Sequence, residues 1–210
     1  MRIGIIGAGQ VGTGLAKLLQ PRGHDLMLSY SRDPLKLAVT ANRFGVRHGS
    51  VAEAVEFAEV VVMATPWSTT SAALHEAGSS VAPKVVWDCT NALKSDLSGL
   101  QIGTTTSAGE EIRRLIPWGR VVKAIPPFAE LMHTGSVRLG EQTATVFVAS
   151  DDPAAKETVT GLVREIGAEA VDAGPLANAR YIEPAGYLLV QLAYMLGRGP
   201  KIGLSLVSQP

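Results

Sequence analysis

The sequence of 210 residues is poor in several features that would assign it to a specialised class of protein. It holds one cysteine, Cys89, which excludes an internal disulfide and any metal site built from several thiolates. Nineteen basic and nineteen acidic residues leave no net charge, and no run of like charge occurs. We therefore expect neither nucleic acid nor an anionic membrane as a partner. The long apolar stretch near the C-terminus, residues 186–197, falls short of the ~20 residues needed to cross a bilayer.

Charged residues are also scarce, at 18% of the chain against roughly 25% in ordinary soluble domains. A large share of the surface should therefore be buried between subunits, and we expect a homodimer. The lone cysteine suits a reducing compartment. Glycines interrupt the apolar N-terminus before Lys17, so we expect no signal peptide and a cytoplasmic location.

What the chain does contain is an alternation of short Val- and Ile-rich runs with stretches of helical periodicity. This pattern is typical of a parallel sheet wrapped by helices. We predict an α/β protein with a doubly wound, mostly parallel sheet, whose first helix covers residues 10–22. The predicted strands are residues 2–6, 25–29, 60–64, 85–88, 121–125, 145–149 and 169–172.

Capping signals place the starts of three further helices. Asp33 precedes a proline, and Ser50 with Glu53 and Ser107 with Glu110 have the spacing of a capping box. Residues 175–197 are nearly uncharged and have a wide apolar face at helical spacing. We therefore divide the chain into a sheet domain, 1–174, and a helical segment, 175–210, that closes over the sheet or packs on a second subunit.

A glycine-rich motif lies between the first predicted strand and the first predicted helix. Its residues are Gly7, Ala8, Gly9, Gln10, Val11 and Gly12, the pattern G-x-G-x-x-G. In this context the first glycine permits a tight turn, the second lets the backbone approach a pyrophosphate, and the third lets the helix pack closely on the strand. The motif predicts a Rossmann-type dinucleotide-binding domain.

The tip of the second predicted strand indicates which dinucleotide binds. No carboxylate stands there to hold a ribose 2′-hydroxyl, whereas Ser31 and Arg32 offer a hydrogen-bond donor and a planar cation suited to a 2′-phosphate. Lys36 adds a second cation or is a solvated surface lysine. We predict NADP(H) rather than NAD(H).

Other candidate residues follow further strands, at the sheet edge where doubly wound folds bind ligands. They are Thr65, Pro66, Trp67, Asn91, Ala124, Ile125 and Pro126. Trp67 packs beside the cofactor or anchors the core, and Asn91 holds a ribose hydroxyl or ends a turn. Pro126 and Pro127 form a stiff wall of the cleft or simply end a strand.

Acid–base and metal chemistry have little support. The four histidines are scattered without metal-ligand spacing, and we expect His133 to be an ordinary exposed histidine. No lysine occurs between Pro175 and Gly199, where a hydroxyacid dehydrogenase would need one to protonate its substrate. We therefore assign no catalytic side chain and no metal ligand.

Together these residues make the chain resemble the NADPH-dependent coenzyme F420 reductase family over nearly its whole length. The resemblance rests on residues 3–9, 31–32, 65–67, 88–91 and, most distinctively, 172–180. It implies NADP bound by the glycines and by Ser31 and Arg32, and hydride transfer to a deazaflavin (coenzyme F420) or flavin-like acceptor. Residues 123–127 depart from the Lys-Ala-Phe-Asn-Thr of many relatives, a difference that bears on the acceptor.

Three alternatives remain open at this stage. The first is an NADPH-dependent flavin or ferric reductase, because the cytosolic domain of the six-transmembrane metalloreductases is similar. The second is a non-catalytic NADP(H) sensor, because the same glycines would serve binding alone. The third is a reductase of a small imine or carbonyl, like the proline-biosynthesis reductases of this nucleotide fold, although the C-terminal part of this chain is short for that role.

Overall fold

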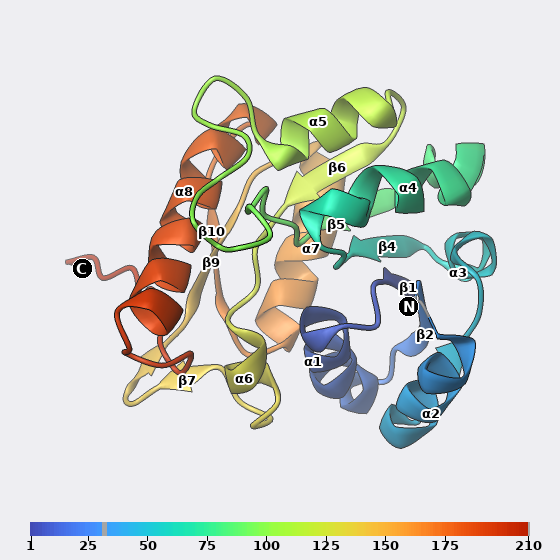
Figure 1. Ribbon diagram of the computed structural model, residues 1–210, viewed down its shortest axis with the longest axis horizontal. Helices are drawn as coiled ribbons and strands as arrows, with labels where there is room; N and C mark the ends of the chain where they lie inside the picture. The colour runs from blue at the N-terminus through green and yellow to red at the C-terminus, as the bar shows by residue number, and fades with distance from the viewer. Residues whose placement is uncertain (31–32, 210) are drawn as a thin grey trace.

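The computed structural model describes residues 1–30 and 33–209. Its centre is a six-stranded parallel sheet in the order β3-β2-β1-β4-β5-β6 (Figure 1). The strands are β1 (Arg2–Ile6), β2 (Asp25–Ser29), β3 (Arg47–His48), β4 (Val60–Met63), β5 (Val85–Asp88), β6 (Arg120–Lys123), β7 (Arg138–Leu139), β8 (Gln142–Thr143), β9 (Thr145–Val148) and β10 (Glu169–Asp172). The chain order reverses between β1 and β4, which confirms the predicted doubly wound α/β fold.

Helices cover both faces of this sheet. They are α1 (Gln10–Leu19), α2 (Pro34–Phe44), α3 (Val51–Phe57), α4 (Trp67–Ala77), α5 (Ala108–Leu115), α6 (Ala129–Met132), α7 (Pro153–Glu165) and α8 (Ala179–Val190). Short 3-10 helices span Gln20–Arg22, Gly78–Val81 and Leu176–Asn178, and a π-helical turn, Gln191–Met195, extends α8.

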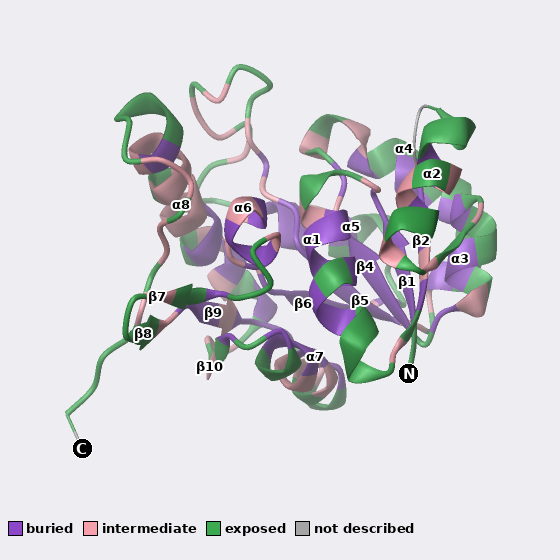
Figure 2. Cartoon of the chain, turned by 90° about the horizontal axis from the view of Figure 1, so that it is seen from below, coloured by how far each residue is buried: buried purple, intermediate pink, exposed green. Residues whose placement is uncertain are grey.

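Successive side chains of each strand point to opposite faces of the sheet, and this alternation divides the core into two layers. In β4, Val60 and Val62 face the layer that contains α1, α2 and α7, while Val61 and Met63 face the layer that contains α3, α4 and α5. Both faces of the central strands are buried (Figure 2). This burial explains why the strands read as continuous apolar runs rather than as alternating ones.

Beyond β6 the sheet continues in a different direction. Lys123 of β6 and Ala149 exchange two backbone hydrogen bonds of 2.9 Å in an antiparallel bridge, which brings the parallel pair β9–β10 beside the main sheet. β7 and β8 form a small antiparallel hairpin. These additions place β9 and the segment after α8 on the same side of the molecule as the carboxyl end of β6.

Predicted helix caps agree with the structure in two of three places. Asp33 accepts hydrogen bonds from the N–H groups of Leu35 and Lys36, and Ser50 with Glu53 forms a complete capping box. At α5, Ser107 caps the helix, but the Glu110 carboxylate binds Arg180 and the Ser107 hydroxyl instead of closing the box. An ion pair with a distant residue therefore competes with the local motif.

Several predicted boundaries were wrong by one to three residues. The strands predicted at 60–64, 121–125 and 145–149 end at Met63, Lys123 and Val148. The first helix ends at Leu19, because the chain continues as a 3-10 helix that contains Pro21, which has no N–H to donate. The division at Gly174 stays a prediction.

Candidate functional site

The glycine loop after β1 has the geometry that dinucleotide binding requires. Gly7 has φ +121°, and a Cβ there would lie 2.4 Å from the Ala64 carbonyl oxygen. A Cβ on Gly12 would lie 1.9 Å from the Gly7 oxygen, whereas one on Gly9 would meet nothing within 4 Å. Gly7 and Gly12 are therefore needed for packing, and Gly9 leaves open space above the start of α1.

That open space lies in front of the positive end of a helix dipole. Gly9 is the N-cap of α1, and no side chain caps the helix there. Uncapped N–H groups at a helix start bind phosphate well. The loop therefore fits the pyrophosphate of a dinucleotide.

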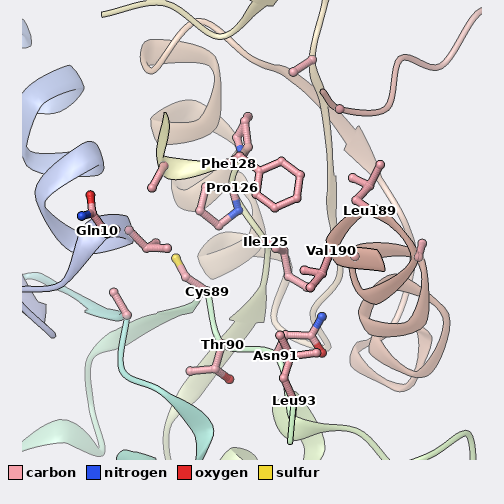
Figure 3. A pocket seen from close by; sticks show the side chains of 18 of the residues that line it. Gln10, Cys89, Thr90, Asn91, Leu93, Ile125, Pro126, Phe128, Leu189 and Val190 are labelled. Carbon is pink, nitrogen blue, oxygen red and sulfur yellow. The ribbon is translucent and has the colours of Figure 1, made fainter. Parts of the chain in front are cut away.

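A cleft of about 450 Å³ begins beside this loop and runs to α8. Figure 3 shows Gln10 on the α1 side, Leu189 and Val190 on the α8 side, and Cys89, Ile125 and Pro126 between them. Eight of the predicted binding residues line the cleft: Gly9, Gln10, Val11, Thr65, Pro66, Asn91, Ile125 and Pro126. The structure thus brings the glycine loop together with the ends of β4, β5 and β6.

The other predicted residues lie elsewhere. Gly7 and Gly12 are buried, and Ala8 packs against the core. Ala124 is fully buried, and its carbonyl oxygen accepts a hydrogen bond from the Trp87 indole N–H. Lys36 is exposed on the first turn of α2. Ser31 and Arg32 lie outside the described residues.

Trp67 is not among the residues that line the cleft. It is half-buried, and both it and Tyr30 pack against the core layer of α3 and α4. Tyr30 has φ +60°, an uncommon conformation for a residue with a side chain. The two aromatic rings therefore belong to the same apolar layer of the core.

Asn91 is fixed so that its side-chain oxygen is free to accept a hydrogen bond. Its Nδ2 donates to the Glu183 carbonyl oxygen at 2.9 Å, and that oxygen can only accept. The Oδ1 atom is buried and has no partner among the described residues. Because Asn91 lines the cleft, Oδ1 can receive an N–H or O–H of a bound ligand.

A buried ion cluster beneath Asn91 was not predicted from the sequence. The Lys123 ammonium lies 2.7 Å from Asp88 Oδ2 and 2.9 Å from Glu183 Oε1, and it donates to the Thr90 carbonyl oxygen. All three charged side chains are at most 2% exposed. Glu183 also accepts the N–H groups of Ala108 and Gly109 at the start of α5. The cluster therefore joins β5, β6, α5 and α8 directly under the cleft.

Cys89 lines the cleft but offers no nucleophile. Burial, and next the negative charge of Asp88, raise the pKa of the thiol well above its ordinary value. The thiolate is the reactive form of cysteine, so Cys89 acts here as a small apolar side chain.

The far end of the cleft carries a second unpredicted group. Tyr194, from the π-helical turn, donates a hydrogen bond of 3.0 Å to Glu130 Oε1. Its ring meets that of Phe128 edge-on, with centroids 5.8 Å apart. Burial and Glu130 raise the pKa of Tyr194 to about 12, so the phenol stays a neutral donor.

His133 is not a cleft residue. Its Nε2 lies 3.1 Å from the Gln10 carbonyl oxygen and 3.3 Å from Thr13 Oγ1, against the side of α1. Across the described part of the chain, no three His, Cys, Asp or Glu side chains are grouped so as to hold a metal ion. Nor is any described helix both long and apolar enough to cross a membrane.

Comparisons with known proteins agree with this geometry. Residues 2–92 match the family model "NADP oxidoreductase coenzyme F420-dependent". The F420-dependent NADP reductase of Methanothermobacter marburgensis is 30% identical over 91% of this chain and 92% of its own length. The crystal structure of a candidate F420-dependent NADP reductase from Arthrobacter sp. FB24 superposes with a TM-score of 0.88, at 29% identity, over 99% of this chain and 100% of that one.

A more distant likeness concerns the fold alone. Pyrroline carboxylate reductase of Plasmodium falciparum, solved with NADP bound, has a TM-score of 0.62 at 14% identity, and the match covers 91% of this chain but 65% of that one. The M. marburgensis relative, in contrast, matches along nearly all of both chains. On these grounds the chain belongs to the family of F420-dependent NADP oxidoreductases.

Proposed function

We propose that this protein transfers hydride between NADPH and a deazaflavin or flavin-like ring. The observation that carries the proposal is a continuous cleft that starts at the dinucleotide loop and ends under α8, with mainly apolar walls. A second ring can lie against a nicotinamide in such a cleft, away from water. The names of the M. marburgensis and Arthrobacter relatives support the same reaction.

The residues proposed to hold NADP extend along the edge of the sheet. The N-terminus of α1 binds the pyrophosphate, and Thr65 and Pro66 lie next to the nicotinamide half. Ser31, Arg32 and Lys36 bind the 2′-phosphate, and Trp67 lies beside the adenosine. Asn91 accepts a hydrogen bond from a ribose hydroxyl through Oδ1, its buried unpartnered oxygen.

Positioning accounts for the proposed catalysis. When bound, the nicotinamide supplies the hydride, and no protein side chain is required to break a bond. Pro126 and Pro127, which both line the cleft, form a stiff wall that would hold the reacting atoms about 3 to 3.5 Å apart, while α8 excludes water from the cleft. The neutral Cys89 thiol adds apolar surface beside them.

The remaining features of the proposal concern the whole protein. The segment 175–210 closes the acceptor end of the cleft, since Ile182, Tyr194 and Leu204 all line it. Exposed apolar side chains on the outer face of α8 support a homodimer. The lone buried cysteine suits the cytoplasm.

Oxidation of NADPH with a panel of acceptors tests the proposal. We expect turnover with a deazaflavin or a flavin, and slower turnover when NADH replaces NADPH. The panel consists of coenzyme F420, 8-hydroxy-5-deazariboflavin, riboflavin, FMN, FAD and ferric chelates. Turnover of ferric chelates alone would replace the ring acceptor by metal reduction.

A parallel binding measurement separates enzyme from sensor. If calorimetry shows tight NADPH binding and no acceptor is reduced, the protein is an NADP(H)-binding sensor and the enzymatic proposal is wrong. If neither form of the coenzyme binds, the proposed cofactor site is wrong as well.

A further inference from the structure

A glycine in the middle of α8 faces the cleft where Asn91 and Ile125 approach the helix. Gly186 lines the cleft, and a Cβ built on it would lie 3.1 Å from Asn91 Nδ2 and 3.3 Å from Ile125 Cδ1. Glycine in a helix interior is less favourable than alanine, so its presence there calls for a physical reason. Because Ile125 Cδ1 ends a flexible side chain that can rotate, Asn91 is the neighbour that a Cβ would disturb.

The backbone beside Asn91 is held in place by the buried ion cluster. The N–H and the hydroxyl of Thr90 both donate to Asp88 Oδ1, at 2.8 and 2.7 Å. The Thr90 carbonyl oxygen accepts from the Lys123 ammonium at 2.7 Å. Asn91 therefore yields to a Cβ on the helix by turning its amide. That turn would break the 2.9 Å hydrogen bond from Nδ2 to the Glu183 carbonyl oxygen.

The same helix also holds the loop that continues from Asn91. Gln191 Nε2 donates to the Leu97 carbonyl oxygen at 2.9 Å, and the Tyr187 hydroxyl donates to the same oxygen at 3.3 Å. Leu97 has φ +59°, an uncommon conformation for a residue with a side chain. The loop after β5 and α8 therefore form one connected wall, and Asn91 is a part of that wall that lines the cleft.

The orientation of the amide decides what Asn91 offers to a ligand. With Nδ2 bonded to the Glu183 carbonyl oxygen, the buried atom without a partner among the described residues is Oδ1, which only accepts hydrogen bonds. A buried acceptor without a donor is unfavourable, and a ligand hydroxyl that reaches Oδ1 removes this cost. A turned amide would present Nδ2 hydrogens instead, which a hydroxyl satisfies less well while the Glu183 bond is lost.

From these contacts we infer that Gly186 is a positioning residue for NADP(H). By leaving room beside Asn91, it keeps the amide turned so that Oδ1 can accept a hydrogen bond from the nucleotide ribose. The inference rests on the proposed function, which assigns that ribose to Asn91. Gly186 acts through Asn91 and takes no part in the hydride step. The one amide group thus joins α8 through Nδ2 and the nucleotide through Oδ1.

NADPH binding, measured without any acceptor, tests the inference. The fluorescence of bound NADPH gives dissociation constants for wild type, Asn91→Ala, Gly186→Ala and the double variant. We expect Asn91→Ala to weaken binding by about three- to tenfold, the loss of one neutral hydrogen bond, and Gly186→Ala to weaken it by a similar factor. In the Asn91→Ala background there is no amide to displace, so the addition of Gly186→Ala should change the dissociation constant by less than about twofold.

Gly161→Ala is a matched control. Gly161 lies inside α7, and a Cβ there would meet nothing within 4 Å among the described residues. This variant makes the same exchange in a helix interior and should bind NADPH as tightly as wild type. Thermal unfolding checks that every variant is folded, and alanine favours a helix over glycine, so a loss of binding in Gly186→Ala would not reflect a weaker helix.

The Asn91 amide can also be observed directly. The chain has three asparagines, Asn42, Asn91 and Asn178, so ¹⁵N labelling of asparagine side chains gives a simple NMR spectrum. The signal pair that Asn91→Ala removes belongs to Asn91. We expect this pair to shift when NADP⁺ is added to the wild type. Without nucleotide, the pair should shift in Gly186→Ala and stay in place in Gly161→Ala.

The outcomes separate the inference from the proposed function. If Gly186→Ala binds NADPH as tightly as wild type, or weakens binding equally with and without Asn91→Ala, the inference is wrong and the function stands. Asn91→Ala with unchanged NADPH affinity would overturn the inference too. If the variants behave as expected but no acceptor is reduced, the inference stands and the proposed hydride transfer is wrong. If the wild type does not bind NADPH, both are wrong.

Discussion

Asp152 shows how a single charged residue joins two elements of this fold. Its carboxylate accepts hydrogen bonds from Arg120 at 2.7 and 3.2 Å, and it caps α7 through the N–H of Ala155. The Arg120 guanidinium, and next the Ala155 N–H, lower the pKa of Asp152 from 3.8 to about 2. The start of β6 is thereby attached to the start of α7.

The lowered pKa makes stability depend on acid pH. Because the folded pKa lies below the unfolded one, the stabilisation is complete above about pH 4 and is lost as the pH falls toward 2. Asp152→Asn keeps a capping side chain but loses the ion pair. The Asp152 side chain is 34% exposed, so after allowance for solvent screening we expect a loss of about 1 kcal/mol at pH 7.

Urea unfolding between pH 2 and 7 measures this effect. The difference between wild type and Asp152→Asn should be largest above pH 4 and should close near pH 2. Glu157→Gln, on the exposed face of α7, serves as the control. A constant difference at every pH would show that the ionised carboxylate is not responsible.

At the scale of single residues, the sequence predicts those residues whose role depends only on the local backbone. Gly7, Gly9 and Gly12 were predicted correctly as a loop because the turn, the open approach and the close packing follow from their spacing alone. Lys123 was not predicted as part of an ion cluster, because Asp88 and Glu183 are far from it in sequence and meet only after the sheet and α8 are assembled. Asn91 was predicted from its place after a strand, but the contact that orients its amide comes from α8.

At the scale of elements, α8 is attached to the sheet by polar contacts as well as apolar ones. Glu183 of α8 reaches Lys123 of β6 and the start of α5, and Arg180 of α8 pairs with Glu110 of α5 at 2.6 Å. The Arg180 hydrogen bond lowers the pKa of Glu110. Because α8 forms one wall of the cleft, these contacts fix the position of that wall.

Removal of the Lys123 ammonium should therefore lower the stability of the fold. Lys123→Met leaves the Asp88 and Glu183 carboxylates buried without their cation, and we expect a loss of about 3 to 5 kcal/mol in the free energy of unfolding. The double variant Lys123→Met with Glu183→Gln should recover part of this loss, since one uncompensated charge is gone. Chemical denaturation of the three proteins measures both differences.

A small effect would change the interpretation of the cluster. If Lys123→Met costs less than about 1 kcal/mol, the carboxylates are protonated or hydrated in the variant, and α8 is held by apolar contacts instead. If the double variant is less stable than the single one, the hydrogen bonds from Ala108 and Gly109 to Glu183 matter more than its charge.

Elements with a clear periodicity were predicted, and very short ones were not. β3, β7 and β8 have two residues each, too few for an alternation to be visible. The segment 175–197 was predicted to be helical, without its divisions, and it is a 3-10 helix, α8 and a π-helical turn in succession. The π-helical turn matters for the site because it directs Tyr194 toward Glu130.

At the scale of the whole molecule, the outer face of α8 is unusually apolar. Tyr181, Leu188 and Met195 recur at heptad spacing and are 70%, 58% and 50% exposed. Leu196, directly after the π-helical turn, is 69% exposed as well. An exposed patch of this kind, on a chain with only 18% charged residues, is typical of a subunit interface.

We expect the protein to be a homodimer that associates through this face. In a twofold interface the same patch faces itself, so one substitution places two like charges together. Leu188→Glu should therefore give a monomer, because two carboxylates would have to be buried next to apolar side chains. Leu188 is not among the residues that line the cleft, so NADPH binding should persist in the monomer.

Light scattering after size exclusion, over a range of protein concentrations, distinguishes the two states. The control is Val39→Glu on α2, which adds the same charge at a 70% exposed apolar residue on another part of the surface, and this variant should remain dimeric. A wild-type mass equal to one chain at every concentration would disprove the dimer. A dimeric Leu188→Glu would place the interface elsewhere, and the exposed face of α8 would then need another reason for its apolar side chains.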